Sequence, residues 1–549
     1  MPKKEVWPTI DQKTNVTPTP NWEGRVQENT KEYFEETSLH GLKYLAQPRV
    51  SKPERVFWFV AVFLSWFFSG YMIYQVMLHS LLKVCIKWQQ SPVLVSFDST
   101  PVPIWKVPFP SFTVCNMNKV MRSKVISIEK ALEQNQSNPD FVTERMFVDE
   151  ICGSETASKI EGQHNLNLTG DDLHHFLSHL SQPCSSMMLR CHFEGFHRNC
   201  GDIFTPVITD EGQCCAFNIM PESIMFKNTG PKQDHDEQEE KRWANWDIQN
   251  GYTDTNGAST NLSTTYEFMP RRALAPGLHM GLSVMLDVQE SEYFCTGSES
   301  VGFKALFHTP ATLPEMIEYG FAISPGSETF FTINPTLMHA QESIHGISYT
   351  KRQCYLQHEK DLRFFRHYTF LNCFMECVSN FTFRTCGCVA YYMPRNSSYM
   401  PICGPKLAKC VFDSVTEVER STLSDTKENK GSGCECLPPC TDINFPHVSS
   451  TTKLRSSTLK MSQELKETHP KLLNDSYVHD NVAIVNIFFK DQHFMRHERS
   501  ELFGITDFFA NIGGLMGLCM GFSILSLVEF VYFFSLRLIL HIQAQKSKS

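Results

Sequence analysis

Apolar residues gather in two long runs near the two ends of the chain. The first run is VFWFVAVFLSWFFSGYMIYQVML, residues 56–78, and the second extends over about residues 505–540. A helix needs about 20 mainly apolar residues to cross a bilayer, and both runs satisfy this length. The first run begins too far into the chain and is too long for a cleavable signal peptide. We therefore predict two membrane helices, over 56–80 and 505–540.

The residues that flank the two runs indicate how the chain is oriented. Basic side chains precede the first run and end or follow the second: Arg49, Lys52, Arg55, Arg537, Lys546 and Lys548. Positive flanks favour the cytoplasmic side of a membrane, so both tails, 1–55 and 541–549, are expected inside the cell. The region 81–504 would then lie outside.

The region between the two runs shows a different pattern. Short strand-like runs such as FTPVIT (204–209) and LSVMLDV (282–288) alternate with polar loops. The acidic run DHDEQEE (234–240) is interpreted as a solvated loop, and a cation or peptide site is the alternative. Residues 451–474 are interpreted as an exposed helix that returns toward the membrane.

Composition limits the class of protein. Hydrophobic residues make up 42% of the 549-residue chain, which is enough for a large core. The net charge is −9 and no long basic block is present, which argues against a nucleic-acid partner. No nucleophile elbow or metal-binding helix motif occurs, so an enzyme is not expected and no cofactor is predicted.

Cysteines and glycosylation sequons agree with the orientation. Of 20 cysteines, Cys85 lies at the end of the first span and Cys519 lies in the second. The other 18 lie in the predicted outer region, as expected for a disulfide-bonded domain in an oxidising compartment. The same region contains the N-x-[ST] sequons that begin at Asn135, Asn167, Asn261, Asn380, Asn396 and Asn474.

The spacing of two cysteine pairs predicts a ladder. Cys373 and Cys377 stand four apart, which on a helix places them on one face about 6 Å apart along the axis. Cys434 and Cys436 stand two apart, which in an extended segment gives about 6.6 Å. If the elements run antiparallel, the bridges are Cys373–Cys436 and Cys377–Cys434. Cys354 is then within reach of Cys440, although spacing alone leaves other pairings and free thiols open.

The segment CHFEGFHRNC offers a second interpretation of cysteine chemistry. Cys191, His192, His197 and Cys200 are residue types that bind zinc. On the oxidising side of a membrane, a Cys191–Cys200 disulfide with solvated histidines is favoured over a zinc site.

Several motifs, in order along the chain, resemble those of the degenerin/epithelial sodium channel family, which includes the acid-sensing channels. They are His40-Gly41, FPSFTVCN (109–116), GQCCAFN (212–218), GFKALFHTP (302–310), the cysteine ladder ending in CECLPPC, and GFS (521–523). Two segments, SLHGLKYL (38–45) and NVAIVNIFFKD (481–491), are most similar in sequence to the arthropod pickpocket branch of the family.

The resemblance implies a fold and an assembly. It implies a hand-like, disulfide-rich α+β outer domain, with its thumb at about 354–440, carried on two membrane helices and assembled as a homotrimer or heterotrimer. Within that domain we also expect the pairs Cys115–Cys214, Cys386–Cys410 and Cys388–Cys403. Partners are left unassigned for Cys152, Cys184, Cys215 and Cys295, and for Cys85.

Glycines in the second apolar run indicate close packing and a break. Gly513, Gly517 and Gly521 recur on one helix face, where small residues let helices approach closely. For Gly513 and Gly517 a packing role is favoured. The resemblance makes Gly521, Phe522 and Ser523 the selectivity filter, where a locally unwound backbone offers oxygens to a permeant sodium ion.

The residues around that filter are assigned on two grounds, charge for the carboxylates and the resemblance for the gating positions. Asp507, Asn511 and Glu529 are expected in the pore or its vestibules, where a carboxylate attracts cations; a carboxylate at interface depth is the alternative. Ala510 is expected where only a small side chain lets the pore close, and His40-Gly41 in a re-entrant element under the pore. A simple turn is the alternative for His40-Gly41.

These expectations define a function. The chain is interpreted as a subunit of a sodium-selective, amiloride-sensitive, voltage-independent channel of the plasma membrane, gated by an extracellular ligand or by force. The alternative is a non-conducting accessory or receptor subunit. The sequence does not identify the stimulus.

Overall fold

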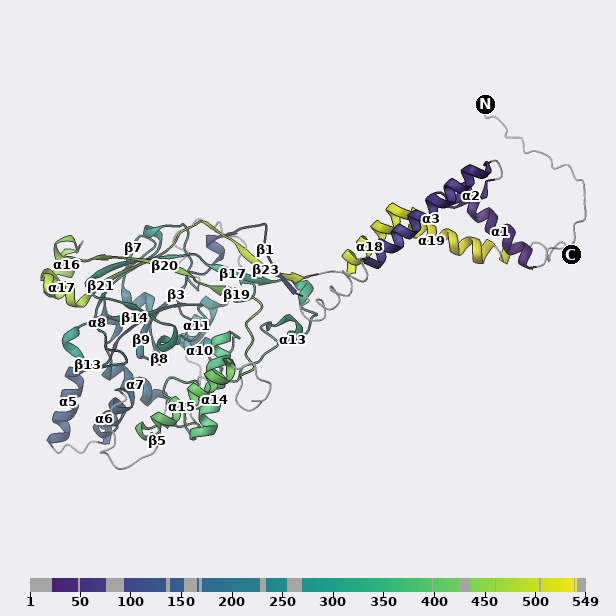
Figure 1. The fold of residues 1–549 in the computed structure, drawn as a ribbon. Helices are drawn as coiled ribbons and strands as arrows, with labels where there is room; N and C mark the ends of the chain where they lie inside the picture. Colours follow the sequence, from purple (N-terminus) through teal and green to yellow (C-terminus); the bar gives the residue numbers. More distant parts are fainter. Residues whose placement is uncertain are drawn as a thin grey trace, which may run out of the picture. The chain divides into compact units, whose positions relative to one another are not determined.

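The chain forms two compact units (Figure 1). The central unit comprises Leu94–Ser500, and the terminal unit combines Met1–Val93 with Glu501–Ser549. The computed structural model describes residues 22–47, 50–75, 93–134, 139–152, 165–166, 170–227, 234–253, 269–396, 398–423, 434–459, 461–502, 505–537 and 539–540.

Two sheets form the centre of the central unit. The larger has the order β20 (His447–Lys453), β16 (Ser327–Ile333), β21 (Val482–Phe489), β12 (Leu282–Asp287), β6 (Met188–Phe193), β7 (Phe196–Arg198). The smaller has the order β15 (Phe321–Ile323), β14 (Phe303–His308), β3 (Ser111–Asn116), β9 (Gly212–Phe217), β8 (Phe204–Thr209). The two runs predicted as strands, 204–209 and 282–288, are β8 and β12.

The polarity of a strand's sequence fits its position in the sheet. β21, with the run VAIVNIFF, is buried along almost its whole length and pairs with β12 and β16, as expected for a strand covered on both faces. β20 carries the polar run HVSSTTK at the sheet edge and is fully exposed. Phenylalanines close the core between the sheets, where the ring of Phe109 lies 5.3 to 5.8 Å from those of Phe193, Phe217 and Phe489.

Smaller sheets complete the strand content. One has the order β1 (Val93–Phe97), β23 (Arg496–Glu501), β17 (Thr336–Ala340), β19 (Asp442–Asn444). Two-stranded pairs are β2 (Val102–Pro103) with β22 (His493–Phe494), β4 (Asn118–Met121) with β13 (Tyr293–Thr296), β5 (Asn165–Leu166) with β18 (Ile402–Cys403), and β10 (Trp246–Asp247) with β11 (Gly251–Tyr252).

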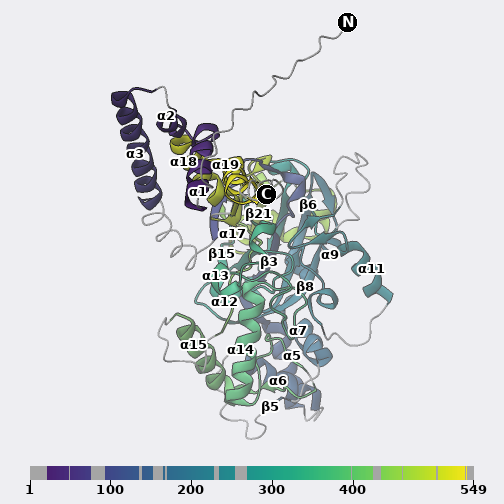
Figure 2. The same cartoon turned by 90° about the vertical axis from the view of Figure 1, so that its right-hand side faces the viewer.

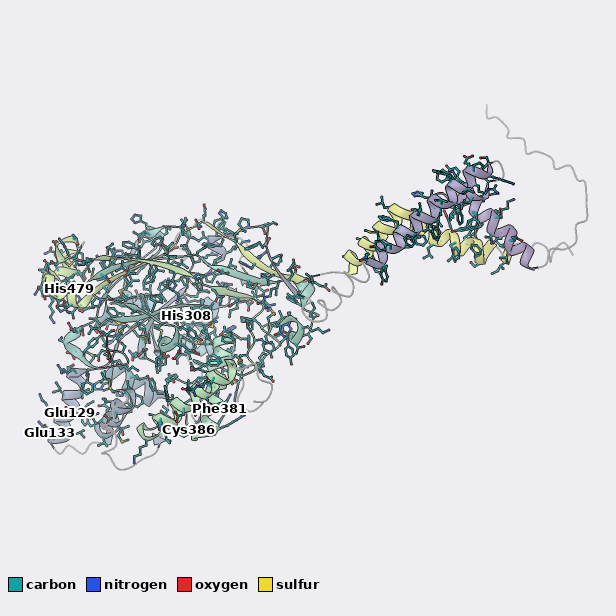
Figure 3. The ribbon with its side chains drawn as sticks, in the orientation of Figure 1. Glu129, Glu133, His308, Phe381, Cys386 and His479 are labelled. Carbon is teal, nitrogen blue, oxygen red and sulfur yellow. A yellow bond between two sulfur atoms is a disulfide. The ribbon has the colours of Figure 1, made fainter. Side chains whose placement is uncertain are left out.

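Two groups of helices flank the sheets. The first is α5 (Arg122–Glu133), α6 (Pro139–Cys152) and α7 (Gly170–Leu180), which lie together around a separate apolar cluster (Figure 2). The second is α14 (Phe370–Cys386) and α15 (Ala408–Leu423), which pack side by side. Figure 3 labels Glu129 and Glu133 on α5, and Phe381 and Cys386 on α14.

Helix α14 carries the cysteine ladder. Thr369 caps its N-terminus by accepting a hydrogen bond from the Asn372 amide, and Gly387 ends it with φ +75°. Cys373 and Cys377 pair with an extended segment, each with a Cα–Cα distance of 5.9 Å to its partner.

The described residues contain nine disulfides, Cys115–Cys214, Cys152–Cys295, Cys184–Cys215, Cys191–Cys200, Cys354–Cys440, Cys373–Cys436, Cys377–Cys434, Cys386–Cys410 and Cys388–Cys403. They include each pair named from the sequence. The four cysteines left unassigned form Cys152–Cys295 and Cys184–Cys215. Cys85 lies outside the described residues.

Two local predictions were wrong. The acidic run at 234–240 is the first part of helix α11 (Asp234–Trp243), which ends on the buried Trp243 and carries an Arg242–Glu239 ion pair at 2.8 Å. Residues 451–474 are not one helix. They contain the end of β20, η8 (Ser456–Thr458), α16 (Gln463–Thr468) and η9 (Pro470–Leu473), because 451–453 pair with β16 and Pro470 interrupts helical hydrogen bonding.

The terminal unit is helical. It contains α1 (Trp22–Glu36), α2 (Leu42–Ala46), α3 (Lys52–Gln75), α18 (Ile505–Met520), α19 (Ile524–Val531) and the π-helix η10 (Tyr532–Arg537). Among the described residues one helix, over Lys52–Met72, is long and apolar enough to cross a membrane. It begins four residues before the predicted start, since Pro53 suits a first helical turn. α3 packs against α18.

Candidate functional site

A break separates α18 from α19. Gly521 has φ +67°, a left-handed conformation that favours glycine. The Gly521 amide donates to Gly517 O at 3.0 Å, and the Phe522 amide reaches Met516 O at 3.3 Å, so α18 ends in a tight turn. The apolar run predicted at 505–540 is therefore interrupted, with α18 and α19 as separate helices and the π-helix η10 following α19.

Serine starts the next helix. The Ser526 amide donates to Ser523 Oγ at 3.2 Å, and the Ser523 amide donates to Ser526 Oγ at 3.1 Å, which together form a capping box. Gly521 thus ends one helix and Ser523 begins another. The backbone of 521–523 is left outside both helices.

The N-terminal segment lies against this break. The His40 amide donates to Met520 O at 3.2 Å, and a Cβ added to Gly521 would meet the His40 ring at 2.7 Å. Gly41 has φ +83°, and a Cβ there would meet Val62 Cγ2 at 2.7 Å. Both glycines are needed, one by the broken helix and the other by the turn that brings His40 to it.

Glu529 is held by the same N-terminal segment. Its Oε2 accepts hydrogen bonds from the Ser38 amide at 3.2 Å and from Ser38 Oγ at 2.9 Å. Ser38 Oγ also lies 3.0 Å from the hydroxyl of the buried Ser526. A chain of polar groups therefore joins Ser523, Ser526, Ser38 and Glu529 on one side of the break.

Helix α1 is attached to the end of the second apolar segment. Asn29 Nδ2 donates to Phe533 O at 2.7 Å. The ring of Tyr33 lies 5.4 to 6.0 Å from those of Phe530, Phe533 and Phe534. Arg537 forms ion pairs with Glu32 and Glu36. Sequence analysis did not identify Asn29, Tyr33, Ser38 or Ser526, because only contacts distant in sequence reveal them.

The other predicted residues of the second apolar run lie on α18. Ala510 is exposed on that helix in a single chain, and nothing lies within 4 Å of a Cβ added to Gly513. Asp507 and Asn511 belong to α18 by backbone position, and their side chains lie outside the described set.

The sequons and the zinc motif are placed as follows. Asn474 is exposed and caps α17 (Asp475–Asn481), whereas Asn380 and Asn396 are half-buried. The sequons at Asn135, Asn167 and Asn261 lie outside the described residues. In CHFEGFHRNC both thiols are consumed by the Cys191–Cys200 bridge, across the β6–β7 hairpin.

The central unit contains a carboxylate-lined cavity that sequence analysis did not identify. It has a volume of about 410 Å³ and is lined partly by α14 and α15 and by Asp210, Glu315, Glu318 and Glu419. Asp210 accepts hydrogen bonds from the Met316 and Ile317 amides at 2.8 and 2.7 Å. Burial, and then the neighbouring carboxylates, raise the pKa of Glu315 to about 8.

The structure combines a glycine-broken helix held by an N-terminal turn with a disulfide-rich domain. Comparison with known proteins gives the family. The family model described as "Amiloride-sensitive sodium channel" matches residues 33–533. The chain belongs to this family, so it is of an ion-channel class and is not an enzyme.

Individual proteins that are similar to this chain support the same family. The chain is 32% identical over 509 residues to Pickpocket protein 28 of Drosophila melanogaster, covering 92% of this chain and 78% of that protein. It is 23% identical to Sodium channel protein Nach of Drosophila melanogaster, covering 93% and 88%. It is 24% identical to Acid-sensing ion channel 2 of Homo sapiens, covering 94% and 88%. The family resemblance inferred from the motifs is confirmed.

Proposed function

We propose that this chain is a subunit of a trimeric, sodium-selective, amiloride-sensitive channel of the plasma membrane. The two membrane spans are α3 and the broken segment α18–α19, and both termini are cytoplasmic. The observation that carries the proposal is the break at Gly521–Ser523, with the His40-Gly41 turn packed against it.

The break gives the chain a way to bind ions. At membrane depth, backbone departs from a helix only where it is buried in protein or lines water. With copies arranged around an axis, the carbonyls of Gly521 and Phe522 and the hydroxyl of Ser523 form oxygen rings that replace part of the hydration shell of a sodium ion. Ser523 keeps this geometry because its capping box fixes the start of α19.

Neighbouring residues tune access to those rings. Asp507, Asn511 and Glu529 line the two vestibules, and their oxygens raise the local concentration of cations. Ala510 lies eleven residues before Gly521 in the sequence, where a small side chain lets the pore helices meet in the closed state. The central unit receives the stimulus, an extracellular ligand or a mechanical force.

Two-electrode voltage clamp of oocytes expressing the chain, alone or with Pickpocket protein 28, tests the proposal. We expect an inward sodium current that amiloride blocks and that does not depend on voltage. If normal surface expression gives no current, and a bulky Ala510 variant is also silent in both settings, the chain is instead a non-conducting accessory subunit.

A further inference from the structure

The hairpin formed by β6 and β7 presents two histidines side by side. Its register pairs His192 of β6 directly with His197 of β7, so both side chains leave the same face of the hairpin. Their ring centroids lie 5.2 Å apart, and the ring planes are nearly perpendicular, at 89°. Both rings line one cavity of about 630 Å³. Two imidazoles therefore share the same accessible space.

The backbone of the hairpin fixes the distance between the two histidines. The strands are joined by a two-residue turn, in which Glu194 has φ +53° and Gly195 has φ +78°, as the tight turns of hairpins require. The Cys191–Cys200 disulfide, with a Cα–Cα distance of 5.4 Å, bridges the same hairpin. β6 also pairs with β12 inside the larger sheet. The pair is thus held by ordered strands and not by a loose loop.

The separation of the rings suits a shared metal ion. With metal–nitrogen bonds of about 2.0–2.1 Å and tetrahedral angles, two imidazole ligands of one zinc ion place their ring centroids roughly 5 Å apart. The observed 5.2 Å already has this value. The terminal torsion of histidine is broad, so the rings can turn their nitrogens toward a common point while the backbone stays in place. The pair can therefore chelate one ion without a change in the hairpin.

Polar side chains continue from the histidines across the sheet. Ser283 of β12 lies opposite His192, and Asn486 of β21 lies opposite Ser283. Both line the same cavity. This wall of the cavity is therefore polar beside the two rings, which suits the water molecules that complete the coordination of a metal ion.

The charges around the cavity are nearly balanced. Arg190 and Glu464 are both among its lining residues. The Arg190 guanidinium also interacts electrostatically with the Glu328 carboxylate, which offsets its repulsion of a cation. A divalent ion can therefore approach the histidines.

We propose that His192 and His197 form a two-histidine site for a divalent transition cation such as Zn²⁺ or Cu²⁺, with water in the remaining positions. The Cys191–Cys200 bridge excludes a zinc centre of four protein ligands, since a disulfide supplies no thiolate, but it leaves both imidazoles in place. Within the described part of the chain, no three His, Cys, Asp or Glu side chains form a ready group of ligands, so the protein supplies two and the solvent the rest.

Imidazole nitrogen selects among cations. It suits Zn²⁺, Cu²⁺ and Ni²⁺, whereas Ca²⁺ and Mg²⁺ prefer oxygen ligands. Because Cu²⁺ binds nitrogen more tightly than Zn²⁺ does, we expect Cu²⁺ to have the higher affinity and Ca²⁺ not to compete. The site thus differs in its chemistry from the oxygen rings proposed for sodium.

Metal titration of the full-length protein, purified in detergent without a polyhistidine tag, tests the proposal. Zn²⁺ binding is measured by competition with a chromogenic indicator, and Cu²⁺ binding by electron paramagnetic resonance, in which nitrogen couplings count the imidazoles. We expect a site with one ion per chain and two coordinated nitrogens. His192→Gln and His197→Gln should each weaken Zn²⁺ binding there by about 100-fold or more, because loss of even a supporting group around a metal costs about 10- to 100-fold.

A register variant is the matched control. His197→Gln with Phe196→His keeps the number of histidines but moves one ring to the other face of the hairpin, opposite Phe193. Phe196 is 46% exposed, so the change is tolerated, and this variant should bind no better than His197→Gln alone. His358→Gln, at an exposed position elsewhere, should leave the affinity unchanged. An equal Tm of all variants without metal shows that each is folded.

Three results would overturn the proposal. They are wild-type affinity in both single variants, wild-type affinity in the register variant, and displacement of Zn²⁺ by an equal concentration of Ca²⁺. A wild-type protein that binds no Zn²⁺ or Cu²⁺ would overturn it as well. Binding is measured without current, so failure here is separate from failure of the channel function.

Discussion

The backbone amide of His40 donates a hydrogen bond to the carbonyl of Met520 at 3.2 Å. In an uninterrupted helix the carbonyl of residue 520 would accept from the amide of residue 524, and the break at Gly521 removes that geometry. The N-terminal turn supplies a donor in its place. Because an unpaired carbonyl that is shielded from water is costly, this hydrogen bond lets the turn and the break stabilise each other.

Gly521→Ala should reduce sodium current strongly. The left-handed φ of +67° is unfavourable for alanine, and the new methyl group would lie 2.7 Å from the His40 ring. We expect about a tenfold loss of current per channel at the surface, measured by voltage clamp with surface biotinylation. Gly70→Ala is the matched control, since nothing lies within 4 Å of a Cβ there. Equal currents in both variants would show that the break has no part in conduction.

Glu529→Gln separates an electrostatic role from a structural one. Glutamine retains an acceptor for Ser38 but removes the charge. If the carboxylate concentrates cations, single-channel conductance should fall by about twofold at low salt, and the difference should shrink at high salt. Ser38→Ala is the companion variant, because it removes the hydroxyl donor and keeps the amide donor. A conductance that is insensitive to Glu529→Gln would leave only the role of anchoring Ser38.

Ala510→Phe should produce a channel that stays open. The proposed closed state brings neighbouring pore helices together at this small residue, and a phenyl ring would hold them apart. The measurement is the amiloride-blocked current without stimulus, expected to exceed that of the wild type by about tenfold, a shift of about 1.4 kcal/mol in the equilibrium between closed and open states. Ala510→Ser should remain closed at rest. A phenylalanine variant that is silent until stimulated would place the gate elsewhere.

The cysteine ladder on α14 shows what spacing can predict. Two cysteines four apart on a helix and two cysteines two apart in an extended segment define a nearly equal separation, which predicts two bridges between these elements. The structure shows that the pairing is antiparallel, Cys373–Cys436 and Cys377–Cys434. The bridge Cys152–Cys295 joins the end of α6 to β13, and no local pattern predicts that these elements meet. Pairings that depend on assembly of the whole unit are beyond what spacing can reveal.

The residues of the candidate site also fall into two groups, those that the sequence predicted and those that it did not. Gly41, Gly521 and Ser523 were singled out by the resemblance of their motifs to the family. The structure gives a physical reason for these residue types, since both glycines have positive φ and Ser523 caps α19. Ser38 and Asn29 were not singled out, since each acts through a contact with a residue about 500 positions away in the sequence. The acidic run at 234–240 was misjudged because its charge favoured a loop, whereas burial of Trp243 stabilises a helix.

Glu315→Gln should stabilise the protein at alkaline pH. Burial raises the native pKa to about 8 from 4.5, so the folded state retains a proton that the unfolded state has released. Stability therefore falls as the pH rises from 4.5 to 8, by up to about 5 kcal/mol. The glutamine variant lacks this loss, so its Tm should exceed that of the wild type at pH 8 and approach it at pH 4.5. A constant difference in Tm across the range would contradict the assignment.

Because His308 is buried, the protein should lose stability as the pH becomes acidic. This histidine lies in the central unit (Figure 3), with Nε2 2.8 Å from Thr113 Oγ1 and Nδ1 2.9 Å from Thr309 O. Burial lowers its pKa to about 4 from 6.5, so unfolding takes up a proton between these values. Stability should fall by about 3 kcal/mol as the pH decreases through this window.

The measurement is the Tm of the purified protein from pH 7 to pH 4 for the wild type, His308→Gln and His479→Gln. His308→Gln should have a lower Tm than the wild type at pH 7, because a buried hydrogen bond is lost, yet its Tm should decrease less toward pH 4. His479 is exposed and pairs with the half-exposed Asp480, a contact that contributes little to stability because solvent screens it, so its variant should follow the wild type closely. If His308→Gln loses as much stability on acidification as the wild type, then His308 is not the group whose protonation opposes folding.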